Sequence, residues 1–151
     1  MNQLFKVLVD GKSCHNGQMV WDLPHDDKAG KWHKVEGELA LCSRGLHLTD
    51  DPARWYKPGC TVYLAEAKEV VGDCCYSQDR KVVARSVRLM REATSEELMS
   101  LRIFLKGNHE IKGLKPGEVA VAAGSSHVKA CDSSQVKACD SSHVKAYDTS
   151  Q

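Results

Sequence analysis

The stretch that decides the fold is residues 39–67, which read LALCSRGLHLTDDPARWYKPGCTVYLAEA. It is dense in apolar and aromatic side chains, and a Gly-bearing bend and a Pro-Gly turn divide it into short elements. We predict a strand at 46–49, then a short helix, then a strand at 61–67. Because neither side of the 61–67 strand is strongly polar, we expect a central strand covered on both faces, with Val62 and Leu64 buried.

The flanking sequence predicts four further strands, at 4–9, 19–23, 32–35 and 81–92. In the last of these the apolar residues change side halfway, which predicts a bulge near Arg85 and Ser86. Thr94 and Glu97 form a capping box, and the apolar spacing that follows predicts a helix running to Leu105. The predicted fold class is therefore α+β, a mixed or antiparallel sheet with two short helices, in a domain formed by residues 1–113.

The end of the chain has an eight-residue period, SSHVKACD, SSQVKACD and SSHVKAYD, which begins at Ser125. One strand parity of each octad carries Ser, Val and Ala, and the other carries His or Gln, Lys, and Cys or Tyr. Small side chains suit the narrow interior of stacked coils, and two octads are needed for one coil. We expect a short β-solenoid-like segment at 114–151, with a disordered tail as the alternative.

Three octads give barely more than one coil, which buries too little apolar surface to stand alone. Stacking on a second copy would close the open edge. We therefore predict a homodimer or a higher assembly through residues 119–151, and the candidate contact residues are Val128, Val136, Val144 and Tyr147. On the polar parity, His127 and His143 are expected to be surface residues.

Composition excludes some classes of function. The formal net charge is +1, so no global field recruits nucleic acid or an anionic membrane. No apolar run is long enough to span a membrane and no signal peptide is present, which predicts a cytoplasmic protein. The chain has seven cysteines without a CxxC spacing, so we expect reduced thiols and no metal site.

No strong catalytic motif is present, but the central stretch offers candidates. His47 and Glu66 on neighbouring strands would form an acid/base pair. The alternative is that His47 is a half-buried structural histidine and that Glu66 pairs with Arg85 or Arg88. The same two arginines are candidates for binding phosphate, against the alternative of a solvated sheet face. Arg44, in the bend, is a further binding candidate.

The segments CSRGLHLTDDPARWY, GCTVYLAEA and DRKVVARSVRLMREAT, followed by the octads, resemble an uncharacterised domain family of phage and prophage proteins. In that family a Cys-x-x-Gly-Leu-His block precedes a Lys-Val-x-Ala strand and often a β-solenoid tail. The resemblance covers residues 39–151 and implies a bacterial or viral origin. It brings no established activity or catalytic residues.

A second resemblance is to the ADP-ribosyltransferase fold, carried by LHLTDDPARWY and the following TVYLAEA. It places His47 and Thr49 near the second conserved block of that fold. It implies NAD as cofactor and Glu92 or Glu118 as the catalytic acid, whereas the first strand offers only Lys6 in place of the expected Arg or His.

Two classes of function follow from the sequence. The favoured one is a non-enzymatic phage-type binding protein that takes a protein partner, such as an inhibitor of a host enzyme or defence complex, needs no cofactor, and uses the repeat as a contact or oligomerisation surface. The alternative is a divergent ADP-ribosyltransferase-like enzyme acting on NAD.

Overall fold

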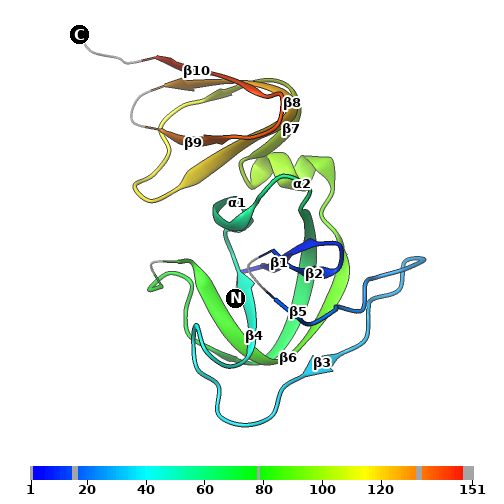
Figure 1. Cartoon of the computed structure of the whole chain (residues 1–151). Helices are drawn as coiled ribbons and strands as arrows, with labels where there is room; N and C mark the ends of the chain where they lie inside the picture. Colours follow the sequence, from blue (N-terminus) through cyan, green and yellow to red (C-terminus); the bar gives the residue numbers. More distant parts are fainter. Residues whose placement is uncertain (1, 15–16, 78, 132–133, 148–151) are drawn as a thin grey trace. The chain divides into compact units, whose positions relative to one another are not determined.

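The structure is a computed structural model, and it describes residues 2–14, 17–77, 79–131 and 134–147. The chain forms two compact units (Figure 1). The first comprises residues 1–55 and 59–93, and the second comprises residues 56–58 and 94–151. The compact units thus divide near residue 93, whereas the predicted domain boundary was at residue 113.

Four antiparallel strands of the first unit close into a barrel. They are β1 (Leu4–Val9), β4 (Leu46–Thr49), β5 (Thr61–Val71) and β6 (Lys81–Glu92). In the ring β1 pairs with β5, β5 with β6, β6 with β4, and β4 with β1. Two short strands extend the sheet, β2 (Lys12–Ser13) on β1 and β3 (His33–Lys34) on β6. Closure leaves none of the four ring strands as an unpaired edge.

Local sequence explains two of the tight connections in this unit. Asp10 and Gly11 both have positive φ, at 48° and 72°, which is the two-residue hairpin geometry that matches strand twist. They link β1 to β2. At the start of β4, Gly45 has a φ of 130°, and a Cβ there would collide with the Val83 side chain of β6. Only glycine permits this close approach of the two strands.

The barrel core contains Leu8, Leu48, Val87 and Leu89, all at most 2% exposed. Trp21, from the loop after β2, packs into the same cluster at 4% exposure. Fully buried aliphatic and aromatic side chains contribute most of the stabilisation of a domain of this size. The centre of the first unit is therefore filled by side chains rather than open.

Three local predictions about this unit are corrected. Strand β5 runs to Val71. Val62 is buried as predicted, but Leu64 is only half-buried, and Tyr63 and Ala65 belong to the core cluster. The register between β5 and β6 shifts between Leu64 and Ala65, where the extra residue is Met90 of β6, so the bulge lies near the end of β6 instead of at Arg85–Ser86. Within residues 19–23 the only bridge is Val20 to Lys12, so no strand forms there, and the strand expected at 32–35 is the two-residue β3.

The second unit begins with α2 (Ser95–Ser100), which has the predicted capping box of Thr94 and Glu97. The helix was expected to run to Leu105, but it ends at Ser100 and β7 (Ile103–Ile111) follows. Burial of Ile103 against β8 outweighs the helical spacing of the apolar residues, because strand pairing also satisfies the backbone here.

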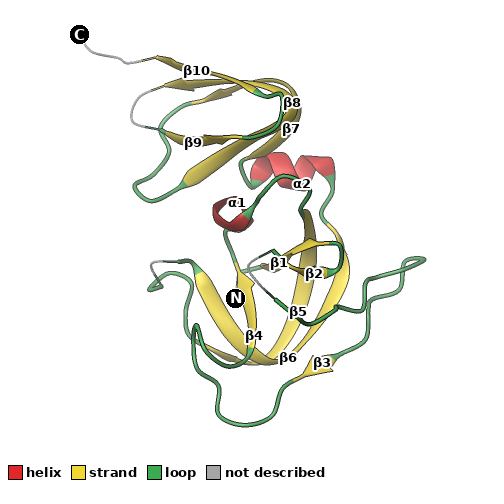
Figure 2. Cartoon of the chain, in the orientation of Figure 1, coloured by secondary structure: helices red, strands yellow, loops and turns green. Residues whose placement is uncertain are grey.

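The octads form parallel strands. Strand β8 (Val119–Cys131) pairs with β7, and with both β9 (Gln135–Ala138) and β10 (His143–Tyr147) (Figure 2). Gln135 lies beside Val119 and His143 beside His127. Both pairs are separated by 16 residues, that is, by two octads. The step from β8 to the next layer, formed by β9 and β10, is therefore two octads long, whereas the step from β7 to β8 is 18–19 residues.

Burial in β8 follows the octad. Ser126, Val128 and Ala130 are at most 4% exposed, whereas His127 and Lys129 between them are exposed. In the next layer the residues of the same parity are more open, because no described strand covers them. Residues 132–133 and 148–151, at a predicted corner and at the end of the predicted contact surface, lie outside the described residues.

The predicted α+β class is wrong. The structure is mostly β, with 52% of residues in strands and 7% in helices, and it consists of the closed antiparallel barrel and a second sheet. The second helix stops after six residues, and the other helix, α1 (Pro52–Trp55), has four. Neither helix is long enough to cover a sheet face, so barrel closure and sheet stacking bury the core instead.

Candidate functional site

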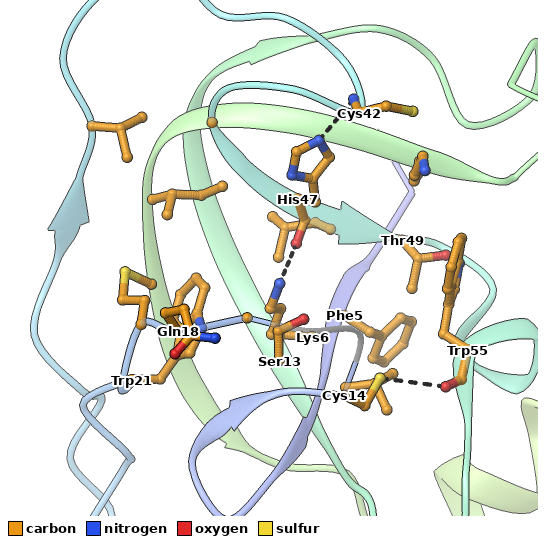
Figure 3. Close-up of a pocket in the computed structure, with 18 residues that line it drawn as sticks. Phe5, Lys6, Ser13, Cys14, Gln18, Trp21, Cys42, His47, Thr49 and Trp55 are labelled. Atoms are coloured by element: carbon orange, nitrogen blue, oxygen red, sulfur yellow. Dashed lines mark hydrogen bonds between the residues drawn. The ribbon is translucent and has the colours of Figure 1, made fainter.

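A pocket of the first unit has a volume of about 530 Å³ and lies against β1, β4 and the loop before β3 (Figure 3). This is within the usual size of small-molecule sites. Its walls include two tryptophans, two lysines and one histidine. No Asp or Glu occurs among the described residues that line it. The pocket is therefore apolar and positively charged.

Lys6 is the most buried charged residue of this pocket, at 9% exposure. It lies on β1 on the same side as the core residues Leu4 and Leu8. Its Nζ donates a hydrogen bond to the His47 carbonyl at 2.9 Å and lies 5.0 Å from the centre of the Trp21 ring. Burial lowers the pKa of Lys6 to about 8. The amine is thus partly neutral at a mildly alkaline pH.

Lys81 provides the second positive charge. Its Nζ lies 5.1 Å from the centre of the Trp55 ring and 3.3 Å from the Asp79 carboxylate. Burial alone would lower the pKa of Lys81, but hydrogen bonds with Cys42 and Asp79 raise it. Lys81 therefore stays charged at neutral pH. Each pocket lysine lies over a tryptophan, a contact that favours the cation.

His47 lines the same pocket, but its ring is already hydrogen-bonded to backbone groups. Nε2 accepts a hydrogen bond from the Cys42 backbone N–H at 3.0 Å, and the ring also bonds the Gly45 backbone. Burial lowers the pKa of His47, and the charges of Lys6 and Lys81 lower it further. The imidazole is neutral at pH 7, and its ring holds the turn before β4 while its carbonyl holds Lys6.

Thr49 and Cys14 complete one wall of the pocket (Figure 3). The Thr49 hydroxyl donates to the Arg80 carbonyl at 2.5 Å and accepts from the Asp51 N–H at 3.0 Å. The Cys14 thiol donates to the Trp55 carbonyl. These hydrogen bonds position the wall and leave the two ammonium groups as the charged features that a ligand would meet.

The structure brings together only some of the predicted site residues. Among them, only His47 and Thr49 line the pocket. Glu66 forms an ion pair with Arg88 at 2.6 Å, and Arg85 pairs with Glu69 at 2.8 Å. Both pairs lie on the strands β5 and β6, so the acid/base pair of His47 with Glu66 is not assembled.

The remaining candidates lie elsewhere. Arg44 is exposed in the bend before β4. Glu118 belongs to the second unit, where it pairs with Arg102 at 3.7 Å and accepts from the Lys115 N–H. Glu92 ends β6 and is exposed. None of these three residues is among the described residues that line the pocket.

The oligomerisation candidates lie on the repeat strands. Val128 is buried, Val136 and Val144 are half-buried, and Tyr147 is exposed with Lys129 over its ring. On the outward side, the imidazoles of His127 and His143 stack with ring centres 4.9 Å apart.

Sequence reasoning missed Lys6, Trp21, Lys81, Trp55 and Cys42 as pocket residues. One signal was present, since Lys6 interrupts the otherwise apolar parity of the first strand between Leu4 and Leu8. A charge at such a position is expensive unless it faces a polar cavity or a partner. The other four residues come together only through barrel closure, which no local pattern encodes.

Two negative observations concern the described residues alone. Within them, no cluster of three or more His, Cys, Asp or Glu side chains is arranged to hold a metal ion. Neither described helix has the length and apolar character needed to cross a bilayer.

Comparisons of the chain with protein-family models, with curated proteins and with solved structures found no match. The resemblances to the phage domain family and to the ADP-ribosyltransferase fold stay predictions from the sequence.

Proposed function

We propose that this chain is a binding protein whose barrel pocket takes a small anionic molecule with an aromatic or other flat apolar part. The observation that carries the proposal is the pair of lysine–tryptophan contacts on a pocket wall without an acidic residue among the described lining. An anion would contact the ammonium group of Lys81, which also pairs with Asp79, and the charged fraction of Lys6. Burial makes such a contact stronger than it is at the surface.

The tryptophans support the apolar part of the ligand. Trp21 and Trp55 both line the pocket, and indole rings offer large rigid contact areas at low entropic cost. A ring that lies against them places its charged substituent near the two ammonium groups. The pocket volume of about 530 Å³ accommodates a ligand of this class.

Calorimetric titration of the whole chain with phenyl phosphate, and with phenol as the neutral comparator, tests the proposal. Phenyl phosphate is expected to bind and phenol to bind at least tenfold more weakly. Lys81→Met should weaken phenyl phosphate by about tenfold, or 1.4 kcal/mol, because one of two cations is lost. Lys28→Met, in an exposed loop, is the matched control and should change nothing. Equal affinity for both compounds, or no binding at millimolar concentration, would contradict the proposal.

The proposal also includes a protein partner, namely a second copy of this chain, and a separate observation on the repeat supports it. Ala138 and Ala146 have the inward parity of the octad but are exposed, because they lie on the outermost described layer. A second copy of the same sheet would cover them, which supports self-association through residues 119–151. A phage origin, and a role as inhibitor of a host enzyme or defence complex, rest on the sequence resemblance alone.

The NAD-dependent alternative has one supporting observation, which is that His47 and Thr49 line the same pocket. A transferase of this kind would also need a carboxylate, and Glu66 and Glu118 are paired with Arg88 and Arg102. NAD titration with a nicotinamide-release assay tests the alternative. Release that is abolished in Glu118→Gln or Glu92→Gln would support it over the binding-protein proposal.

A further inference from the structure

The Lys6 amine differs from an ordinary structural lysine. Its side chain is buried at 9% exposure beside the core residue Trp21, and its Nζ donates a hydrogen bond to the His47 carbonyl. Described ion pairs do not include Lys6, although other lysines such as Lys34 and Lys81 have carboxylate partners. A buried ammonium without a carboxylate pays the cost of desolvation, and the neutral amine does not.

The neutral form has a chemical consequence. With its pKa lowered by burial to about 8, roughly one quarter of Lys6 is neutral at pH 7.5, against about 0.1% for an exposed lysine of pKa 10.5. Only the neutral amine has the lone pair that attacks a carbonyl carbon. Within this chain, Lys6 is thus prepared for such an attack, and it lines a pocket that admits small molecules.

The surroundings indicate which carbonyl compounds would fit. Lys81 keeps its charge and lines the same pocket, so it would contact the anionic group of a ligand, and the rings of Trp21 and Trp55 in the lining would contact its apolar part. The His47 ring is hydrogen-bonded to the Cys42 and Gly45 backbone, and the His47 carbonyl accepts the hydrogen bond that orients the Lys6 amine. The reactive nitrogen and the anion-binding group therefore come from two different residues.

We propose that Lys6 forms an imine with an aldehyde or ketone that carries an anionic group and binds in this pocket. The inference rests on the proposed function and deepens it by naming the ligand class. Nζ of the neutral amine attacks the carbonyl carbon and forms a C–N bond. The resulting carbinolamine loses water, which carries away the carbonyl oxygen and both amine protons. No oxidant or reductant takes part, and hydrolysis reverses the reaction.

The test uses the whole chain with pyridoxal 5′-phosphate, an aromatic phosphate with an aldehyde, followed by borohydride reduction and peptide mass mapping. At pH 7.5 and a substoichiometric amount of probe, Lys6 should be labelled at least tenfold faster than exposed Lys28. The rate at Lys6 should level off above pH 8, whereas the rate at Lys28 should rise through pH 10. Selectivity should disappear in denaturant.

Two comparisons complete the experiment. Lys6→Arg keeps a donor for the His47 carbonyl but cannot form the imine, so the labelled fraction at this position should fall to zero. If that variant does not fold, peptide mass mapping of the unaltered chain still shows whether Lys6 is the labelled lysine. Phenyl phosphate, which lacks a carbonyl, should slow the labelling of Lys6 and leave that of Lys28 unchanged.

The possible failures are distinguishable. If phenyl phosphate binds but Lys6 is labelled no faster than Lys28, the imine is overturned and the anion-binding proposal stands. If Lys6 is labelled selectively but phenyl phosphate does not slow the reaction, the imine forms without the proposed pocket, and this inference is overturned together with its premise.

Discussion

The two compact units bury their cores in different ways. The barrel of the first unit closes its own ring of hydrogen bonds around large side chains such as Leu8, Leu89 and Trp21. The parallel sheet of the second unit stacks small side chains such as Ser126 and Ala130 and leaves its outermost described layer open. A closed barrel has a core of fixed size, because no further strand can join the ring. A stacked sheet has a core that grows with each layer added to its open end.

The largest effect should come from the closed core. Leu89→Ala removes a side chain with 0% exposure and should lower the free energy of unfolding by about 2–5 kcal/mol. Leu64→Ala, at a half-buried position in the same barrel, is the control and should cost less. Chemical denaturation measures both. Equal losses at the two positions would mean that closure does not set the core-facing side of β5.

Lys6 should make barrel stability depend on pH. Between pH 8 and pH 10.5 the unfolded chain holds more protons on this residue than the folded chain, because burial lowers the folded-state pKa to about 8. Relative to Lys6→Met, the unaltered protein should therefore gain about 3 kcal/mol as the pH rises through this window. Urea denaturation of both proteins at pH 7.5 and pH 10.5 measures the difference.

Cys74 provides a control of opposite sign. Burial raises the pKa of its thiol to about 11. The thiol therefore contributes fully to the free energy of unfolding below pH 9, and this contribution is lost as the pH rises towards 11. Comparison of the unaltered protein with Cys74→Ala should show this loss. A pH-independent difference between Lys6→Met and the unaltered protein would refute the assigned burial of the Lys6 charge.

The open layer of the second unit predicts self-association. Ala146→Lys places a charge on the inward parity of the outermost described layer and should weaken a dimer by at least tenfold, or about 1.4 kcal/mol. His143→Lys places the same charge on the outward parity of the same strand and should leave the dimer intact. Light scattering over a concentration series decides it. A monomer in the unaltered protein, or equal effects of the two variants, would remove the repeat as the joining surface.

The smallest effect concerns the helix that opens the second unit. Thr94→Ala removes the side chain that accepts the Glu97 N–H and should cost about 1 kcal/mol. Ser95→Ala, one position later, lacks this capping role and serves as the control. Thermal unfolding compares the two. If Ser95→Ala lowers stability as much as Thr94→Ala, the lost stability does not come from the Thr94 cap.

Local signals in the sequence predicted some elements well. The apolar pattern gave the bounds of β1 and β4, and Thr94 with Glu97 gave the start of α2. These features depend on residues that are adjacent or a few positions apart. The burial of alternate residues in β8 is also legible, because the octad repeats one pattern of small and charged side chains.

Features that depend on distant pairings were not predictable from local pattern. Closure of the ring joins Phe5 to Thr49, and this pairing decides that Tyr63 rather than Leu64 faces the core. The pocket depends on the same closure, since Lys6, Trp55 and Lys81 come from distant parts of the chain. The helical spacing of apolar residues after Ser100 gave a wrong prediction for the same reason, because pairing with β8 makes residues 103–111 a strand.

The 16-residue step from β8 to β9 and β10 has a genetic consequence. A duplication or deletion of two octads adds or removes one whole layer and returns every residue to the side it had before. Insertion or deletion of a single octad would shift the strands by half a layer. The octad that contains Gln135 would then lie where an octad that contains a histidine, such as His127, now lies. We therefore expect that the repeat can gain or lose 48 base pairs of coding sequence without a compensating change in the part that encodes the barrel.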